Sequence, residues 1–286
     1  MNADSKRNKR ILDRMLDSEN SLSRCTDQMG REVVIPARPQ KIISLVPSQT
    51  ELLHHLGLGE RVVGITRFCV HPASWFRSKP RVGGTKKVDL DKVRALRPDL
   101  IIGNKEENER TDIEALEKEF PVWMSDARSL DQALQMCLLI GGITGTQARA
   151  EELARAISDA FTALKPIAPA RTAAYFIWRG PLMVAGGDTF ISDLMRRCGL
   201  VNVFAHAEAR YAEIAPGQMA AADPDVILLS SEPFPFAEKH VAEFNMICPG
   251  TPVRLVDGEM FSWYGSRMLS APVYLTEVIH SIQRTA

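Results

Sequence analysis

The chain has 286 residues, long enough for two domain cores, because single domains cluster at about 100–150 residues. Its composition, 45% hydrophobic and 24% charged, excludes a disordered or low-complexity protein. The 35 Lys and Arg residues balance 35 Asp and Glu residues, so the basic excess that is typical of nucleic-acid-binding proteins is missing. We therefore expect a packed globular protein without a nucleic-acid partner.

Residues 1–25 are predicted to be a flexible polar leader. Their basic residues are not followed by the apolar run of about 7–15 residues that a signal peptide needs. No later segment approaches the ~20 apolar residues that span a bilayer. Five widely spaced cysteines without a Cys-x-x-Cys pair argue against a disulfide framework. As written, the sequence predicts a monomeric cytoplasmic protein that is not membrane-embedded; a different start site would make it periplasmic.

Residues 26–128 are predicted to form an α/β lobe. Two strand-like pieces on either side of Gly30 predict a hairpin over Thr26–Pro39. Short apolar runs then alternate with helical stretches, which favours parallel strands with crossover helices. These runs are Lys41–Val46, Arg61–Thr66, Leu100–Gly103 and Val122–Ser125.

A connecting helix and a second lobe complete the prediction. Residues 129–165 are rich in Ala, Leu, Glu and Arg and contain no proline, which predicts one long helix, bent near Gly141, Gly142 and Gly145. Residues 166–286 resume the alternation of strands and helices. We expect an α/β protein with two parallel-sheet lobes joined by one long helix, with a cleft between the lobes.

Three stretches carry a resemblance to a known family. KIISLVPSQTELLHHLGLGERVVGIT and RVGGTKKVDLDKVRALRPDLIIG resemble the first lobe of the cobalamin, heme and ferric-siderophore receptors of ABC importers, of the helical-backbone metal receptor type. PGQMAAADPDVILLS, residues 216–230, is similar to a pattern of their second lobe. The resemblance implies a class III periplasmic binding protein fold, a corrinoid, heme or ferric chelate as bound ligand without a covalent cofactor, and a permease partner.

The resemblance also implies two docking residues. Receptors of this family usually present one acidic side chain from each lobe to arginines of the permease. The first matching position is Asp91 of VDLDKV. The second falls on Gly217, which has no carboxylate, so the nearby Glu213 is the substitute.

Ligand contacts are expected in the loops that follow strands, because ligands of open α/β sheets bind beyond the carboxyl ends of the strands. In the first lobe this rule selects Gln49, the Cys69–His71 loop, Lys86, Asn104, Lys105 and Glu106. Cys69 and His71, two residues apart, would share one face of an extended segment; they bind a metal jointly, contact a ligand, or pack the loop. Lys86 is placed to meet an anionic group or to lie in a solvated turn.

In the second lobe, aromatic residues and arginines gather in the loops. Aromatic side chains in loops are hard to explain as core, so stacking on a planar ligand is expected. Arg267 is predicted either to pair with a ligand carboxylate or phosphate, or to form a surface salt bridge. Asp188 of the GGDTF stretch is predicted to cap a helix. The predicted contacts of this lobe are Trp178, Arg179, Phe234, Phe261, Trp263, Tyr264 and Arg267.

The sequence thus predicts a non-catalytic binding protein for a small polar or metal-containing compound, used in ABC-type uptake. One alternative is a cytosolic binding or regulatory protein of the same fold that takes no part in transport. The other is a metal-dependent enzyme built on Cys69 and His71, for which the sequence supplies no orienting partner.

Overall fold

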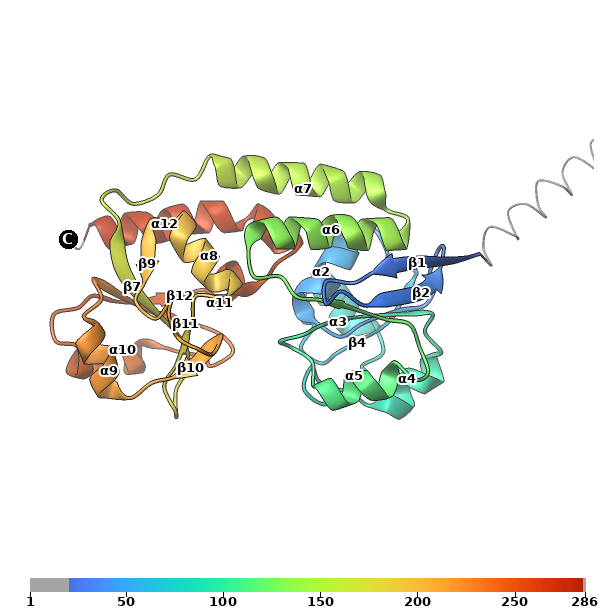
Figure 1. The fold of residues 1–286 in the computed structure, drawn as a ribbon, viewed down its shortest axis with the longest axis horizontal. Helices are drawn as coiled ribbons and strands as arrows, with labels where there is room; N and C mark the ends of the chain where they lie inside the picture. The colour runs from blue at the N-terminus through green and yellow to red at the C-terminus, as the bar shows by residue number, and fades with distance from the viewer. Residues whose placement is uncertain (1–20, 285–286) are drawn as a thin grey trace, which may run out of the picture. The chain divides into compact units, whose positions relative to one another are not determined.

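A computed structural model describes residues 21–284. The chain divides into two compact units. The first runs to Asp126 and includes Gln135–Ala154; the second comprises Ala127–Leu134 and the chain from Arg155 onward. Figure 1 shows the order of the elements along the chain.

The first unit contains a hairpin and a parallel sheet. The hairpin strands are β1 (Leu22–Thr26) and β2 (Glu32–Pro36), and the sheet strands are β3 (Ile42–Ser44), β4 (Val62–Ile65), β5 (Leu100–Asn104) and β6 (Val122–Ser125). The sheet has the order β4-β3-β5-β6, with every pair parallel, as predicted. The predicted hairpin is also present, but β1 begins at Leu22, so the last residues of the expected leader belong to a strand. Residues 1–20 of that leader lie outside the described chain.

Helices connect the strands of the first unit and cover its sheet. They are α2 (Pro47–His55), α3 (Ala73–Ser78), α4 (Leu90–Leu96) and α5 (Arg110–Leu116). Asp89 begins α4 by accepting a hydrogen bond from the Lys92 amide, and Arg97 ends it in a left-handed conformation. Ile43 and Ile101 of the sheet pack in one buried cluster with residues of α4 and α5. Each fully buried aliphatic side chain contributes about 1.5–3 kcal/mol to folding.

The expected single connecting helix is instead two helices, α6 (Leu130–Thr144) and α7 (Gln147–Thr162). The break is at Gly145, whose φ of 67° is left-handed and which lies between the two helices. A Cβ at Gly141 would lie 2.3 Å from the Cβ of Ala150, so this glycine lets the helices approach closely and run side by side (Figure 1). The predicted bend near Gly141, Gly142 and Gly145 is instead a break between two helices: Gly141 and Gly142 lie in the last turn of α6, and only Gly145 lies in the connecting turn.

The second unit contains a mixed sheet, not a purely parallel one. Its strands are β7 (Arg171–Trp178), β8 (Met183–Ala185), β9 (Leu200–Asn202), β10 (Tyr211–Glu213), β11 (Val226–Ser230) and β12 (Val253–Val256). The order is β10-β8-β7-β11-β12, with β9 also paired to β7. Strands β7, β9, β11 and β12 pair in parallel, whereas β8 and β10 are antiparallel. Strands β8 and β10 have three residues each, too few for a run of apolar residues to identify them.

Helices cover both faces of the second sheet. They are α8 (Phe190–Arg197), α9 (Pro216–Ala222), α10 (Glu238–Ile247), α11 (Gly258–Ser262), the 3-10 helix η1 (Ser266–Leu269) and α12 (Ala271–Gln283). Phe176 of β7 packs in a buried cluster with Met219 of α9 and Phe244 of α10. On the opposite face, the ring of Tyr175 lies 5.1 Å from that of Phe261 in α11. The N-cap of α8 is Thr189, not the predicted Asp188, which pairs with Arg128 and Arg210.

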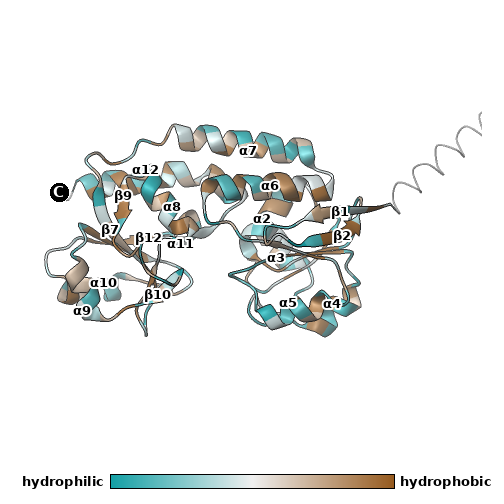
Figure 2. Cartoon of the chain, in the orientation of Figure 1, coloured by the Kyte–Doolittle hydropathy of each residue, from teal (hydrophilic) through white to brown (hydrophobic). Residues whose placement is uncertain are grey.

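Hydropathy follows this burial. Figure 2 shows hydrophobic residues along the sheet strands and in the middle of α6, whereas α7 carries many hydrophilic residues. No helix within residues 21–284 combines the length and the apolar character that crossing a membrane requires.

Candidate ligand site at the strand ends

A buried polar network closes the strand ends of the first unit. Gln49 is fully buried, and its amide nitrogen donates to the Gly103 carbonyl at 3.1 Å and to Ser125 Oγ at 2.6 Å. Asn104 donates to the same Ser125 hydroxyl at 3.0 Å. Gln49 and Asn104 were both predicted to contact a ligand. Their burial contradicts a direct contact, and their bonds tie together the strands that carry the loops.

Asn104 also shapes the loop that follows β5. Its Oδ1 accepts hydrogen bonds from the main-chain amides of Glu106 and Glu107, at 2.8 and 3.0 Å. Asn108 closes the other side of the loop, since its Oδ1 accepts from the Asn104 amide and its Nδ2 donates to the Thr85 carbonyl. The loop is therefore held in one shape from inside.

Three predicted contact residues lie on the outer side of this loop. Lys86 is exposed and donates from Nζ to the main-chain oxygen of Glu106. Lys105 is exposed and pairs with Asp126 at 3.1 Å. The structure thus brings Lys86, Lys105 and the half-buried Glu106 to one loop cluster, where their side chains remain candidates for ligand contact.

The loop after β4 corrects the metal prediction. Thr66–Cys69 is a turn, closed by a hydrogen bond from the Cys69 amide to the Thr66 carbonyl. The Val70 amide also donates to the Phe68 carbonyl, so Cys69 belongs to a tight turn and not to the predicted extended segment Cys69–His71. Cys69 is fully buried, and its sulfur lies 3.0 Å from Thr50 Oγ1 and 3.1 Å from Thr66 Oγ1. Burial raises the pKa of the Cys69 thiol, so the neutral thiol is the stable form at neutral pH.

The group that was predicted to bind a metal together with His71 is a buried, neutral thiol. His71 is only half-buried, whereas the Cys69 sulfur is enclosed by hydroxyl groups. Within residues 21–284, no three His, Cys, Asp or Glu side chains gather in a position to hold a metal ion. The burial of the Cys69 thiol among hydroxyl groups therefore argues against a joint metal site of Cys69 and His71 and removes support for the metal-enzyme alternative.

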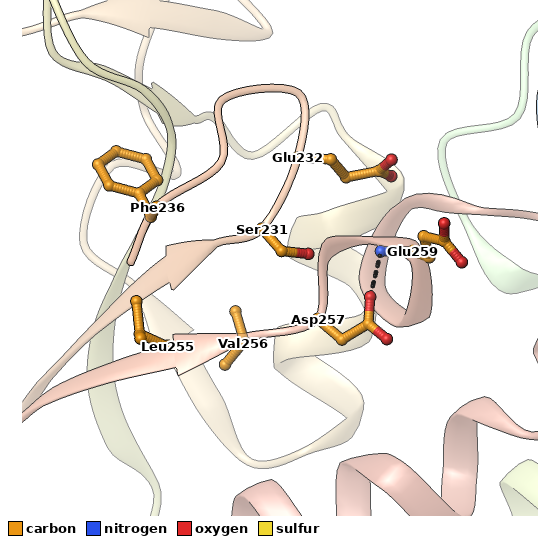
Figure 3. A pocket seen from close by; sticks show the side chains of 7 residues that line it. All are labelled: Ser231, Glu232, Phe236, Leu255, Val256, Asp257 and Glu259. Atoms are coloured by element: carbon orange, nitrogen blue, oxygen red, sulfur yellow. Dashed lines mark hydrogen bonds between the residues drawn. The ribbon is translucent and has the colours of Figure 1, made fainter. Parts of the chain in front are cut away.

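A shallow pocket of about 610 Å³, open to solvent, lies at the strand ends of the second unit. Its lining comes from the residues that follow β11 and β12: Ser231, Glu232, Phe236, Leu255, Val256, Asp257 and Glu259. Figure 3 shows the carboxylates and the Ser231 hydroxyl at one end, and Phe236 and Leu255 at the other. The pocket thus joins an acidic, acceptor-rich end to an apolar end.

Hydrogen bonds hold the acidic end in place. Ser262 Oγ donates to Glu232 at 2.7 Å, and the Glu259 amide donates to Asp257 at 3.0 Å. Arg267 pairs with Glu259 at 3.2 Å, so the structure shows the predicted salt bridge for this arginine. Carboxylates fixed in this way can accept hydrogen bonds from amide, hydroxyl or ammonium groups of a ligand.

Close packing leaves no space beneath Glu232. Gly258 lies directly under the loop, because a Cβ there would be 2.3 Å from Ser230 Oγ and 2.5 Å from Glu232 Cγ. Ser230 also accepts a hydrogen bond from the buried Tyr175 hydroxyl at 3.1 Å. The floor of the pocket is therefore rigid.

Three of the predicted stacking residues are buried core. Phe261 is fully buried, and Trp263 and Tyr264 are 8% and 5% exposed. Tyr264 packs edge-on against Phe190 at 5.6 Å, and the Arg267 guanidinium covers the Trp263 ring at 5.0 Å. The prediction of open stacking faces is wrong for these three, because the loop folds into α11 and η1 and turns its rings inward.

The remaining aromatic predictions fall on a more exposed cluster. Trp178 is 39% exposed and lies edge-on to the half-buried Phe234 at 5.7 Å. Arg179, next to Trp178, forms an ion pair with Glu243 at 2.6 Å. Trp178 and Phe234 therefore remain candidates for ligand contact, whereas Arg179 already has a carboxylate partner.

Sequence reasoning missed the acidic pocket residues. Asp257 directly follows β12 and Glu232 is the second residue after β11, so the strand-end rule selects both. The contacts predicted in these two loops were instead their aromatic residues and Arg267. The predicted docking residues, Asp91 and Glu213, are both exposed; Asp91 forms an ion pair with Arg94 at 2.8 Å.

The fold and the strand-end loops define a class. Two α/β units whose parallel strands end in loops with polar and aromatic side chains are typical of small-molecule binding proteins. A family model described as periplasmic binding protein matches residues 42–245. The chain belongs to the periplasmic binding protein family, as the sequence motifs predicted.

Individual relatives agree with this assignment. A vitamin B12-binding protein of Pectobacterium carotovorum is 26% identical over 241 residues, covering 82% of this chain and 86% of the relative. A solved periplasmic vitamin B12 binding protein of Vibrio cholerae has a TM-score of 0.72 at 21% identity, over 87% of this chain and all of that one (100%). The periplasmic heme-binding protein RhuT from Roseiflexus sp. RS-1 has a TM-score of 0.69 at 21% identity, over 86% and 98%.

Proposed function

We propose that this chain is the substrate-binding component of an ABC-type importer and that it binds a corrinoid, heme or ferric chelate. The family match over residues 42–245 carries the proposal. The vitamin B12-binding relative, which aligns with 82% of this chain, supports the ligand class. The bound compound is cargo and is not covalently attached.

The strand-end loops support this function better than catalysis. The acidic pocket offers acceptors for donor groups, and Trp178 and Phe234 offer aromatic edges. The thiol of Cys69, the only nucleophile that the sequence had paired with a base, is buried and neutral. We therefore propose non-catalytic binding.

Direct ligand binding tests the proposal. Protein purified from its native host is examined for metal content and for the absorbance bands of corrinoids, heme or iron chelates. Thermal unfolding is then measured with cyanocobalamin, hemin and a ferric siderophore, because a ligand at about 100 times its Kd stabilises the folded state by about 2.7 kcal/mol. A colourless, metal-free protein that none of these compounds stabilises would refute the proposal.

The proposed partner is an ABC permease that docks on Asp91 and Glu213. Both carboxylates are exposed, as binding to arginines of a permease requires. Replacing both, Asp91→Asn with Glu213→Gln, is expected to reduce copurification of permease subunits from host membranes without changing ligand affinity. Unchanged copurification would remove these two residues from the docking surface.

We propose a periplasmic location, in keeping with that partner. Cell fractionation followed by N-terminal sequencing of the isolated protein tests it. A processed N-terminus in the periplasmic fraction supports this location, whereas an intact Met1 or Asn2 in the cytosol supports the alternative that the sequence as written predicts.

A further inference from the structure

The turn after β4 contains two exposed residues that are not among the ligand contacts predicted above. Arg67 and Phe68 occupy the centre of the Thr66–Cys69 turn. Both are exposed, Phe68 to 49%. The turn lies at the carboxyl end of a parallel strand, on the edge where ligands of α/β sheets bind.

Buried contacts fix this turn from below. Cys69 anchors it through Thr50 and Thr66, at 3.0 and 3.1 Å. The Arg67 amide also donates to the Gly83 carbonyl at 2.9 Å. Because both sides of the turn are bonded to the unit, its two central side chains project from a rigid base.

The Arg67 side chain is held in place by packing. Its guanidinium lies 5.0 Å from the centre of the Phe68 ring, a cation–π contact. It also packs on Gly84, where a Cβ would lie 3.3 Å from two guanidinium nitrogens and 3.2 Å from the Phe68 ring. A larger residue at position 84 would displace the pair.

Arg67 has no carboxylate partner among residues 21–284. Arg31, Arg94 and Arg110 of the same unit each form an ion pair with an acidic side chain. The turn against which Arg67 packs also carries Lys86, whose ammonium group donates to a main-chain oxygen of the loop after β5. The strand end therefore offers a pre-positioned guanidinium whose charge is not neutralised.

We propose that Arg67 recognises an anionic substituent, a carboxylate or phosphate, of the bound compound, while the exposed Phe68 ring packs against its apolar part. A guanidinium binds such groups through parallel hydrogen bonds, and its fixed position lowers the entropy cost of binding. The inference rests on the proposed function and narrows it to ligands that carry a negative charge beside an apolar surface.

Matched ligands and variants test this inference. Hemin carries two carboxylates, hemin dimethyl ester carries neither, and cyanocobalamin has no carboxylate but carries one anionic phosphodiester. Each is titrated into the full chain and followed by absorbance and fluorescence quenching. The variants are Arg67→Gln, Arg67→Lys and the control Arg77→Gln, which removes the same charge from an exposed arginine of α3. Circular dichroism confirms that each variant is folded.

Arg67→Gln is expected to weaken hemin binding about tenfold or more, the effect of one charge-assisted hydrogen bond, and to leave the ester unaffected. Arg67→Lys should retain part of the affinity and Arg77→Gln all of it. Added salt should reduce the preference of the wild type for hemin over its ester.

Three results would overturn the inference. Equal hemin affinity of wild type and Arg67→Gln, or equal losses for hemin and its ester, would exclude charge recognition while leaving the binding function intact. If cyanocobalamin binds and hemin does not, equal cyanocobalamin affinity of wild type and Arg67→Gln would do the same. If the wild type binds neither these three compounds nor a ferric siderophore, the proposed function itself fails and the inference fails with it.

Discussion

The two units close the carboxyl ends of their parallel strands in different ways. In the first unit, Gln49, Asn104 and Ser125 bond to one another inside the protein. In the second, the rings of Phe261 and Trp263 fill the interior beside an acidic pocket. Polar side chains at the strand ends therefore form a buried hydrogen-bond network in the first unit, whereas they line a pocket in the second. The type of residue at a strand end does not reveal which of these roles it has.

The largest effect is expected from the aromatic interior of the second unit. Phe261→Ala should reduce the free energy of unfolding by about 3–5 kcal/mol, because it leaves a cavity beside Tyr175. Urea unfolding measures the change, with Phe68→Ala, at an exposed ring, as the control. A loss below about 1 kcal/mol for Phe261→Ala would show that the ring is not core.

The polar interior of the first unit should respond somewhat less. Asn104→Ala should cost about 2–4 kcal/mol, because it leaves buried partners at Ser125 and Glu106 without hydrogen bonds. The control is Asn245→Ala, at an exposed position of α10, which should change stability by less than about 0.5 kcal/mol. Similar changes in the free energy of unfolding for the two variants would show that the buried hydrogen bonds of Asn104 do not stabilise the first unit.

A third substitution tests the rigid floor of the acidic pocket. Gly258→Ala should destabilise the protein by about 1–3 kcal/mol and displace Glu232, because the new methyl group overlaps Ser230 and Glu232. Gly217→Ala is the control, since the space around Gly217 in α9 is open and alanine favours the helix. Thermal unfolding of both variants measures the effect on packing, and ligand titration then measures the effect on binding. Equal thermal stability of Gly258→Ala and Gly217→Ala would mean that the loop of Glu232 moves to accommodate the new methyl group.

The smallest effect concerns pH and the Cys69 thiol. Burial raises the pKa of this thiol, so folding favours its neutral form. The stabilisation is fully present below about pH 8.5, where an unfolded cysteine ionises, and is lost as the pH rises through the higher pKa of the folded thiol.

The difference in stability between wild type and Cys69→Ala should therefore shrink above that pH, by at most about 1.4 kcal/mol per pH unit. Chemical unfolding at pH 7 and pH 10 measures it. A difference that stays constant over this range would show that the thiol is not shielded.

Much of the fold was predictable because its signals are local. The apolar runs around Ile43, Ile101 and Trp123 form parallel strands at the expected places, since a buried strand needs only a short uninterrupted run of apolar residues. The connecting segment was harder. Gly145 could either bend one helix or separate two. The outcome depends on the packing of Gly141 in α6 against Ala150 in α7, a contact that the helical periodicity of the sequence does not reveal.

The sequence by itself determined the α/β architecture, the location of the main strands along the chain and the family, because periodicity and motifs act over a few neighbouring residues. Only the tertiary structure decided which strand-end side chains face outward. Cys69 and Arg67 are two residues apart in one turn, yet hydroxyl groups of Thr50 and Thr66 enclose the thiol, while Gly84 and Phe68 hold the guanidinium at the surface. Burial is set by partners distant in sequence, so it could not be read from the loop alone.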